Sequence, residues 1–68
     1  MKISARNRLK GTITEVIKGA TTAHVRIDIG GSLVTASITN EAVDELDLEV
    51  GGTAYAVVKA SDVMVAVD

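Results

Sequence analysis

The polar side chains near the start of the sequence are nearly all hydrogen-bond donors. Within seven residues the chain gathers a hydroxyl, two guanidinium groups, an amide and an ammonium, on Ser4, Arg6, Arg8, Asn7 and Lys10. A tetrahedral oxyanion offers only acceptors, so its site needs such donors together with backbone N–H groups and a cation. The segment therefore fits oxyanion binding. Its plainer interpretation is a basic, solvated start to a domain.

A smaller group of donors lies near the end of the chain. Lys59, Ala60 and Ser61 place a cation and a hydroxyl at the end of the fourth predicted strand, just before a turn at Asp62. Spacing along the chain does not show whether this group meets the first one. Composition and spacing alone leave the function open.

The sequence gives little support for catalysis, for metal binding or for nucleic-acid binding. The only histidine, His24, lies in a predicted strand beside Arg26 on the polar face, where no Ser-His-Asp arrangement is expected. The acidic residues at 41–49 follow a helix surface rather than the spacing of metal ligands. One aromatic residue, Tyr55, and a net charge of −2 do not suit the stacking, basic grooves that bind nucleic acid. We expect no enzyme activity, no catalytic cofactor, no protein-ligated metal and no nucleic-acid partner.

Alternating apolar residues predict a mainly β domain that fills residues 1–68. The first strand contains a slip or bulge near Glu15-Val16, and a turn follows at 18–20. Alternation is cleanest in the second strand, and Gly30-Gly31 after it supplies the backbone of a tight hairpin. The last two strands are apolar on both faces. The five predicted strands cover residues 9–17, 23–29, 34–39, 53–59 and 63–67.

One short helix is predicted between the third and fourth strands. Asn40 is a good N-cap, Glu41 and Asp44 suit a helix start, and apolar residues recur at helical spacing to cover a barrel end. Five strands with a helix in this position follow the order of an OB-like barrel. Because small β domains use this architecture for unrelated ligands, the fold alone does not predict a function.

A chain of 68 residues needs more than its own core. It buries only about 60% of the surface that its unfolded form exposes, so such chains add disulfides, a metal or association with other chains. This chain has no Cys and one His, yet 47% of its residues are hydrophobic, so we expect a homo-oligomer. No apolar run approaches the ~20 residues of a membrane span, and the start is too polar for a signal peptide. We expect a cytoplasmic protein with no membrane partner.

Two segments of the sequence resemble the molbindin (Mop) family. They are residues 4–11, Ser-Ala-Arg-Asn-Arg-Leu-Lys-Gly, and residues 58–64, Val-Lys-Ala-Ser-Asp-Val-Met. The resemblance spans the entire chain and includes the Lys-Gly-Ala turn at 18–20, the Gly-Gly hairpin, the helix at 40–48 and the chain length. Each piece is weak alone, and together they are specific.

This resemblance implies an OB-like barrel that exchanges a strand within a dimer and assembles into a hexamer, a trimer of dimers. It also implies molybdate or tungstate bound at subunit interfaces, for storage and homeostasis of the metal. One kind of site would use both donor segments, with Lys59 as the main counter-charge, and a second kind would lie in the turn after the first strand, near the three-fold axis. Carried over by position, the first site comprises Ser4, Ala5, Arg6, Asn7, Lys59, Ala60 and Ser61, and the second Gly19, Ala20, Thr21 and Thr22.

Two alternative functions stay open at this point. An OB-type module for oligonucleotides or for another protein predicts exposed aromatics or a continuous basic face, and the sequence shows neither. A purely structural subunit would use the donors of residues 4–10 only to pair with backbone across an interface. In that case a change at Lys59 would weaken assembly without selectively removing anion binding.

Overall fold

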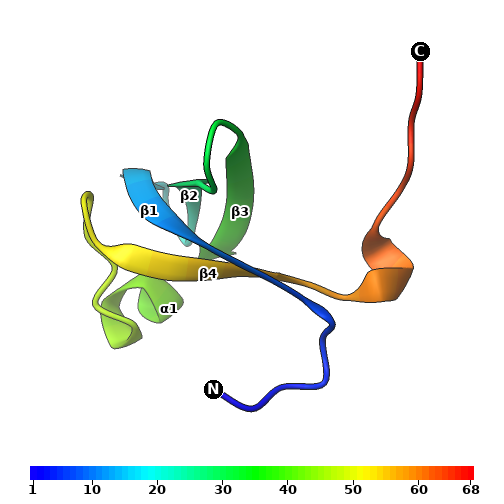
Figure 1. Ribbon diagram of the computed structural model, residues 1–68. Helices are drawn as coiled ribbons and strands as arrows, with labels where there is room; N and C mark the ends of the chain where they lie inside the picture. The colour runs from blue at the N-terminus through cyan, green and yellow to red at the C-terminus, as the bar shows by residue number, and fades with distance from the viewer.

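Four antiparallel strands and one short helix make up the computed structural model, which describes residues 1–68 (Figure 1). The strands form one sheet in the order β3-β2-β1-β4, so β3 and β4 are its edges. Neither helical segment has the length and apolarity that crossing a bilayer requires. The elements are β1 (Asn7–Lys18), β2 (Thr22–Asp28), β3 (Leu33–Thr39), α1 (Asn40–Glu45), β4 (Thr53–Val58) and a 3₁₀ turn, η1 (Ala60–Asp62).

The long strand β1 pairs with β4 through its first half and with β2 through its second half. The register of the β1–β2 pair shifts between Ile13 and Glu15, which confirms the slip predicted next to Glu15. A bulge of this kind bends a strand and increases its twist. Gly11 lies where the backbones approach closely, because a Cβ there would be 2.3 Å from the carbonyl oxygen of Asp28.

The β2–β3 hairpin follows the predicted alternation. Val25 and Ile27 are buried in β2, while exposed and half-buried residues alternate along β3. Gly30 and Gly31 have φ angles of 104° and 100°, which other residues rarely adopt. The Asp28 carboxylate accepts hydrogen bonds from the N–H groups of both glycines, at 2.9 and 3.1 Å. These bonds favour the ionised carboxylate and lower the pKa of Asp28 below its ordinary value.

Helix α1 is capped by Thr39, so the prediction that Asn40 is the N-cap is wrong. The Thr39 hydroxyl accepts a hydrogen bond from the backbone N–H of Ala42 at 3.1 Å. Both residue types are favoured caps. Asn40 is engaged elsewhere, because its side chain donates to the Gly19 carbonyl at 3.0 Å. The helix ends at Glu45, before the predicted boundary at residue 48.

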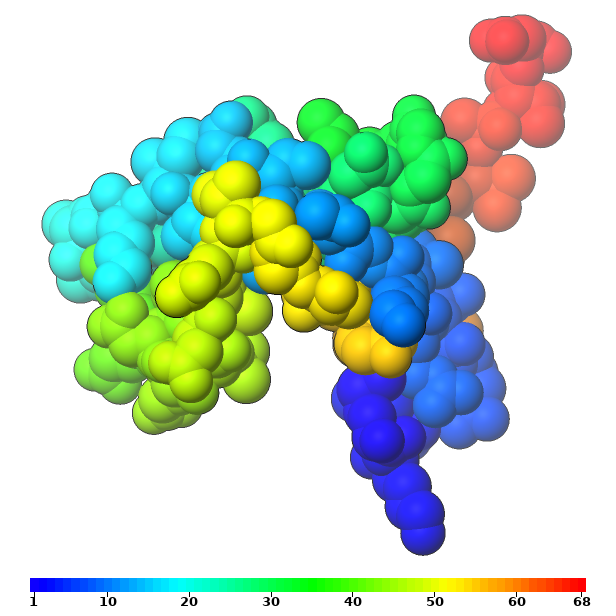
Figure 2. Space-filling view, turned by 60° about the vertical axis from the view of Figure 1, so that its left-hand side comes forward, coloured from blue at the N-terminus to red at the C-terminus, as the bar shows by residue number.

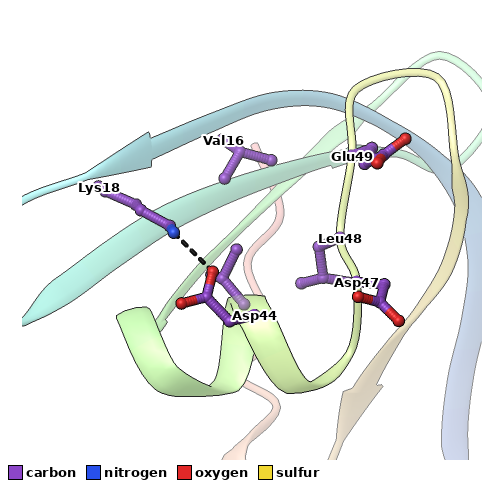
Figure 3. A pocket seen from close by; sticks show the side chains of 7 residues that line it. Val16, Lys18, Asp44, Asp47, Leu48 and Glu49 are labelled. Atoms are coloured by element: carbon purple, nitrogen blue, oxygen red, sulfur yellow. Dashed lines mark hydrogen bonds and ion pairs between the residues drawn. The ribbon is translucent and has the colours of Figure 1, made fainter.

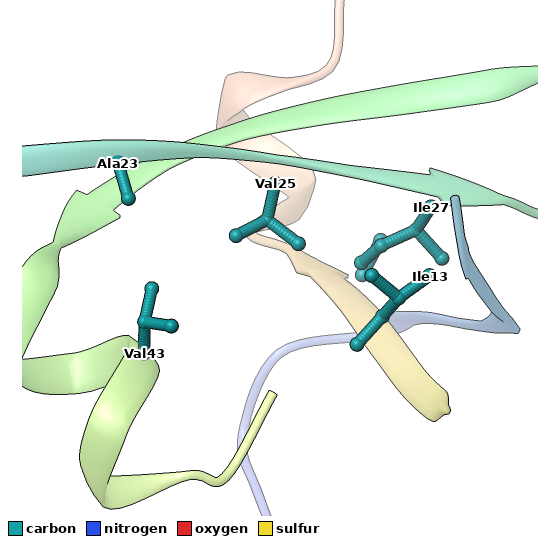
Figure 4. Close-up of a cluster of buried hydrophobic side chains, with 6 residues drawn as sticks. Ile13, Ala23, Val25, Ile27 and Val43 are labelled. Carbon is teal, nitrogen blue, oxygen red and sulfur yellow. The ribbon is translucent and has the colours of Figure 1, made fainter. Parts of the chain in front are cut away.

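The core lies between the sheet and α1, which contributes Val43 (Figure 4). Only six residues are buried, which agrees with the marginal core expected of so short a chain. Beside the core lies an open trough of about 640 Å³, bordered by apolar residues of both edge strands. The buried residues are Ile13, Ala23, Val25, Ile27, Val43 and Ala56. The trough is bordered by Val34, Ala36 and Ile38 of β3 and by Ala54, Ala56 and Val58 of β4.

Residues 63–68 form an extended arm that leaves the sheet after η1 (Figures 1 and 2). The predicted fifth strand at 63–67 pairs with nothing in this chain, because the arm runs away from the sheet. The single chain is therefore a four-stranded half-barrel and not the closed five-stranded barrel expected. Apolar side chains of the arm are exposed, Met64 by 93% and Val67 by 92%. The arm also raises the radius of gyration to 12.6 Å, against ~11 Å for a compact chain of this length.

Candidate functional site

The two predicted donor segments lie at the same end of one pair of strands. The start of β1 pairs with the end of β4, with Asn7 opposite Val58, and the Asn7 amide donates to the Val58 carbonyl at 3.2 Å. Residues 4–6 precede this pair of residues and residues 59–61 follow it, so the two segments leave the same end of the strand pair. The spacing of residues along the sequence could not show this arrangement.

Several hydrogen-bond donors have no acceptor at the β1–β4 junction, the end of the strand pair where Asn7 lies opposite Val58. The N–H groups of Ala60 and Ser61 have no acceptor in the chain, since the hydrogen bonds of η1 begin with the N–H of Asp62. Arg6 donates through Nε to the carbonyl of Ser4 at 2.9 Å, and its terminal nitrogens make no hydrogen bond. The Lys59 side chain is exposed and forms no ion pair. An oxyanion at this junction would meet backbone donors and a cation together.

The unpaired positive charges are concentrated near this junction. Two of the seven cations are in ion pairs, Lys18 with Asp44 at 2.6 Å and Arg26 with Glu15 at 2.9 Å. The others lie within the first ten residues or directly after β4, where Asp62 of η1 adds one opposing carboxylate. Such a concentration attracts anions to this part of the surface. The unpaired cations are Lys2, Arg6, Arg8, Lys10 and Lys59.

The second predicted site lies at the opposite end of β1. The N–H of Gly19 donates to the Thr22 carbonyl at 2.7 Å, which confirms the turn predicted after the first strand. The N–H groups of Ala20 and Thr21 have no acceptor in the chain. The 12 residues of β1 separate this turn from the β1–β4 junction. The two predicted sites therefore share no residue within one chain.

A polar hollow of about 550 Å³ lies between α1 and the end of β1 (Figure 3). Lys18 points toward Asp44 in this hollow, and Asp47 and Glu49 also line it. Three carboxylates and one paired ammonium make the hollow unsuitable for an oxyanion. Because Lys18 is already paired with Asp44, its charge is also partly neutralised for an anion at the adjacent turn.

The remaining polar residues form no further cluster for chemistry. No group of three or more His, Cys, Asp or Glu side chains is placed to hold a metal ion. His24 is exposed and lies opposite Ser37 in the β2–β3 ladder, two residues after the second predicted site.

Sequence reasoning missed two details beside the predicted sites. One is the helical form of the predicted turn at Asp62, the 3₁₀ turn η1, whose first N–H groups are free, because a run as short as Ala60–Asp62 carries no helical period that could predict it. The other is Asn40, which binds two carbonyls of the β1–β2 turn. An Asn at a helix start was a signal, but it was equally compatible with a capping role.

The family model of the TOBE domain matches residues 3–65 of this chain, which include the whole curled sheet and the short helix. The chain belongs to this family. Its close relatives are molybdenum-pterin-binding and molybdate-binding proteins, so the resemblance to the molbindin (Mop) family is confirmed.

Three relatives make the comparison specific. A probable molybdenum-pterin-binding protein of Haemophilus influenzae is 51% identical over 69 residues, covering 100% of both chains. A molybdate-binding protein from Sporomusa ovata has a TM-score of 0.92 at 41% identity, covering 97% of this chain and 98% of that one. The cytoplasmic molybdate-binding protein ModG, solved with molybdate bound, has a TM-score of 0.88 at 43% identity, covering 94% of this chain and 46% of ModG. The mainly β fold with one short helix is thereby confirmed.

Proposed function

We propose that this protein binds molybdate, tungstate or both at subunit interfaces of a homo-oligomer, and stores these oxyanions in the cytoplasm. The observation that carries the proposal is the β1–β4 junction, where both donor segments adjoin the Asn7–Val58 pair, Lys59 is unpaired and the N–H groups of Ala60 and Ser61 are free. The relatives point to the anion, because two are described as binding molybdate and one as binding molybdenum-pterin. That ModG is described as cytoplasmic supports the location.

Binding at this first site is reversible capture. The dianion loses water on entering an interface, and the oriented donors form hydrogen bonds that are stronger in the drier surroundings. Phosphate near neutral pH carries a proton that needs an acceptor, whereas the junction offers mainly donors. Sulfate lacks that proton but is smaller than molybdate, so the size of the pocket must exclude it. No covalent step is required.

The trough and the arm together account for assembly. The trough is bordered by the two edge strands, β3 and β4, whose outer backbone groups have no strand partner in this chain. An apolar strand from a second copy would pair with both edges and complete a five-stranded barrel. Residues 63–67 of the arm are such a strand. Two copies therefore exchange arms to form a dimer, and three dimers form a hexamer. Because the arm follows Ser61 and Asp62 directly, this exchange brings the first site to a subunit interface.

The second proposed site is the turn at Gly19–Thr22. Each copy offers the free N–H groups of Ala20 and Thr21, with hydroxyls on Thr21 and Thr22. Around a three-fold axis, three such turns would surround one oxyanion with donors from three chains. This site therefore exists only in the assembled protein.

Elemental analysis combined with native mass spectrometry tests the proposal. The protein is equilibrated with molybdate and tungstate in excess sulfate, and the metal content of each oligomer is measured. We expect hexamers that retain Mo or W. Hexamers free of both metals would contradict the oxyanion proposal and favour a structural subunit, while monomers that retain the metal would contradict interface sites.

A further inference from the structure

The turn between β1 and β2 is tied to the start of α1 by one residue. Asn40 donates from Nδ2 to the Gly19 carbonyl at 3.0 Å and from its backbone N–H to the Thr21 carbonyl at 3.0 Å. The Thr22 carbonyl already accepts from the N–H of Gly19. Three carbonyls of this segment therefore have donors within the chain, and two of those donors belong to Asn40.

The groups left over in the turn are mainly donors. The N–H groups of Ala20 and Thr21 are free, and only the Ala20 carbonyl lacks a donor. A carbonyl oxygen facing an oxyanion would repel it, whereas an N–H attracts it. By engaging the carbonyls of Gly19 and Thr21, Asn40 gives the turn the donor surplus that an oxyanion needs.

The amide of Asn40 is held in an orientation that leaves its own oxygen unsatisfied. Oδ1 is buried and has no hydrogen-bond donor, which is unfavourable for a polar atom. Turning the amide over would place Oδ1 against the Gly19 carbonyl, so that two acceptors would face each other. An apolar side chain would avoid the unsatisfied oxygen altogether. The hydrogen bond donated by Nδ2 therefore explains the residue better than packing does.

We propose that Asn40 is the positioning residue of the second oxyanion site, an inference that rests on the function proposed above. Asn40 holds the carbonyls of Gly19 and Thr21 away from the ligand, so that the N–H groups of Ala20 and Thr21 are presented to it. Asn40 itself does not touch the anion.

The test is a titration of the full-length Asn40→Ala variant with molybdate. Calorimetry measures the binding affinity, and ¹⁵N NMR monitors the backbone amide signals. In the unchanged protein we expect the Ala20 and Thr21 amide signals to shift as molybdate fills the sites at the Gly19–Thr22 turns, which form the second class of sites. In the variant the affinity of this class should fall at least about tenfold, the scale of one charge-assisted hydrogen bond from a misplaced turn N–H to the anion. The class that depends on Lys59 should keep its affinity.

Thr39→Ala is the matched control. It removes the N-cap of α1 and so destabilises the same helix start, but it keeps both hydrogen bonds of Asn40 to the turn. We expect it to leave the affinity of both classes unchanged. If Asn40→Ala does not assemble, Asn40→Ser supplies the same test, because the serine hydroxyl is too short to reach the Gly19 carbonyl.

Several results would overturn the inference. One is an equal loss at the second class in Asn40→Ala and Thr39→Ala, which would reflect helix stability alone. Another is an unchanged response of the Ala20 and Thr21 amides in Asn40→Ala. If these amides never respond while the Lys59-dependent class fills, the inference fails and the proposed function stands. If neither class fills in the unchanged protein with molybdate or with tungstate, the proposed function itself fails.

Discussion

Lys59 differs from the paired cations, Lys18 and Arg26, in the groups that surround it. It forms no ion pair and directly precedes the two free N–H groups of Ala60 and Ser61. Lys18 and Arg26, by contrast, are already paired with carboxylates. An ammonium group beside oriented backbone donors forms the charge-assisted hydrogen bonds that bind an oxyanion most strongly.

We expect Lys59→Ala to weaken molybdate binding at the first site at least about tenfold, since the counter-charge is lost while the backbone donors stay. Calorimetry measures the affinity and native mass spectrometry the assembly, which should be intact. Lys2→Ala is the matched control, because it removes the same charge from an exposed, unpaired lysine outside both proposed sites. Loss of assembly with unchanged affinity in the remaining oligomers would instead indicate a structural subunit.

The hydrogen bonds at Asp28 make the hairpin sensitive to pH. Because the folded-state pKa of Asp28 is lowered by the N–H groups of Gly30 and Gly31, its carboxylate stabilises the fold above the unfolded pKa of about 3.9. This contribution is lost as pH falls through the lower, folded-state pKa. We expect Asp28→Ala to be less stable than the unchanged protein at neutral pH and to approach it in stability well below pH ~4. Urea unfolding across this range measures the difference, and a gap that persists in strong acid would contradict the assignment.

Among the elements, β1 has the largest role in placing both proposed sites. Its first residues pair with β4 at the first site, and its last residue precedes the turn of the second. Between them, Thr12 pairs with β4 on one side and with β2 on the other, and the bulge near Glu15 follows within the half paired with β2. The close backbone approach at Gly11 lies at the crossing from one partner to the other.

Gly11→Ala should destabilise the protein by about 1–3 kcal/mol, the usual result of forcing an extra methyl group into packed structure. The added Cβ would lie 2.3 Å from a backbone oxygen and 2.7 Å from Ile27, and the backbone atom cannot move aside cheaply. Urea unfolding at one fixed protein concentration measures the change. Lys10→Ala, an exposed change one residue earlier in β1, should stay within about 0.5 kcal/mol. If Gly11→Ala leaves the stability unchanged, β1 and β2 can move apart at Gly11 without cost, which would contradict this prediction.

For the whole molecule, exposed apolar surface is the feature that points to assembly. The arm exposes four large apolar side chains, and the trough offers an apolar lining between two unpaired strand edges. Each would be covered if one copy placed its arm in the trough of another. The small core of the single chain would then be extended across the dimer.

Val65→Asp should prevent assembly. Val65 is 88% exposed in the single chain, so the change should not disturb the chain's own core, but in an exchanged arm it would bury a carboxylate in an apolar trough. Native mass spectrometry and sedimentation should show a shift from hexamers to smaller species. Val50→Asp places the same charge at another exposed valine, before β4, and should leave assembly intact. Intact hexamers of Val65→Asp would contradict arm exchange.

Local patterns in the sequence determined the elements of this protein. Alternation in β2, the Gly30-Gly31 turn and the slip beside Glu15 were predictable, because strand period and glycine conformation depend on near neighbours in the chain. The donor-rich segments at 4–7 and 59–61 could be identified for the same reason, since their chemistry is visible in the residue types. The choice between Thr39 and Asn40 as helix cap was not predictable, because the two residue types are nearly equivalent caps.

Tertiary structure alone decided which of these pieces meet. The pairing of β1 with β4 places the segments at 4–7 and 59–61 at the same end of one strand pair, and contact with the Gly19 turn gives Asn40 its proposed role. It also decided that residues 63–67 of the arm stay unpaired in their own chain, although this continuous apolar run predicted a strand. A repeating apolar pattern specifies that a segment can be a strand, but a strand forms only where a partner's backbone groups are within reach. That partner is set by how the chain folds in space and not by the segment itself.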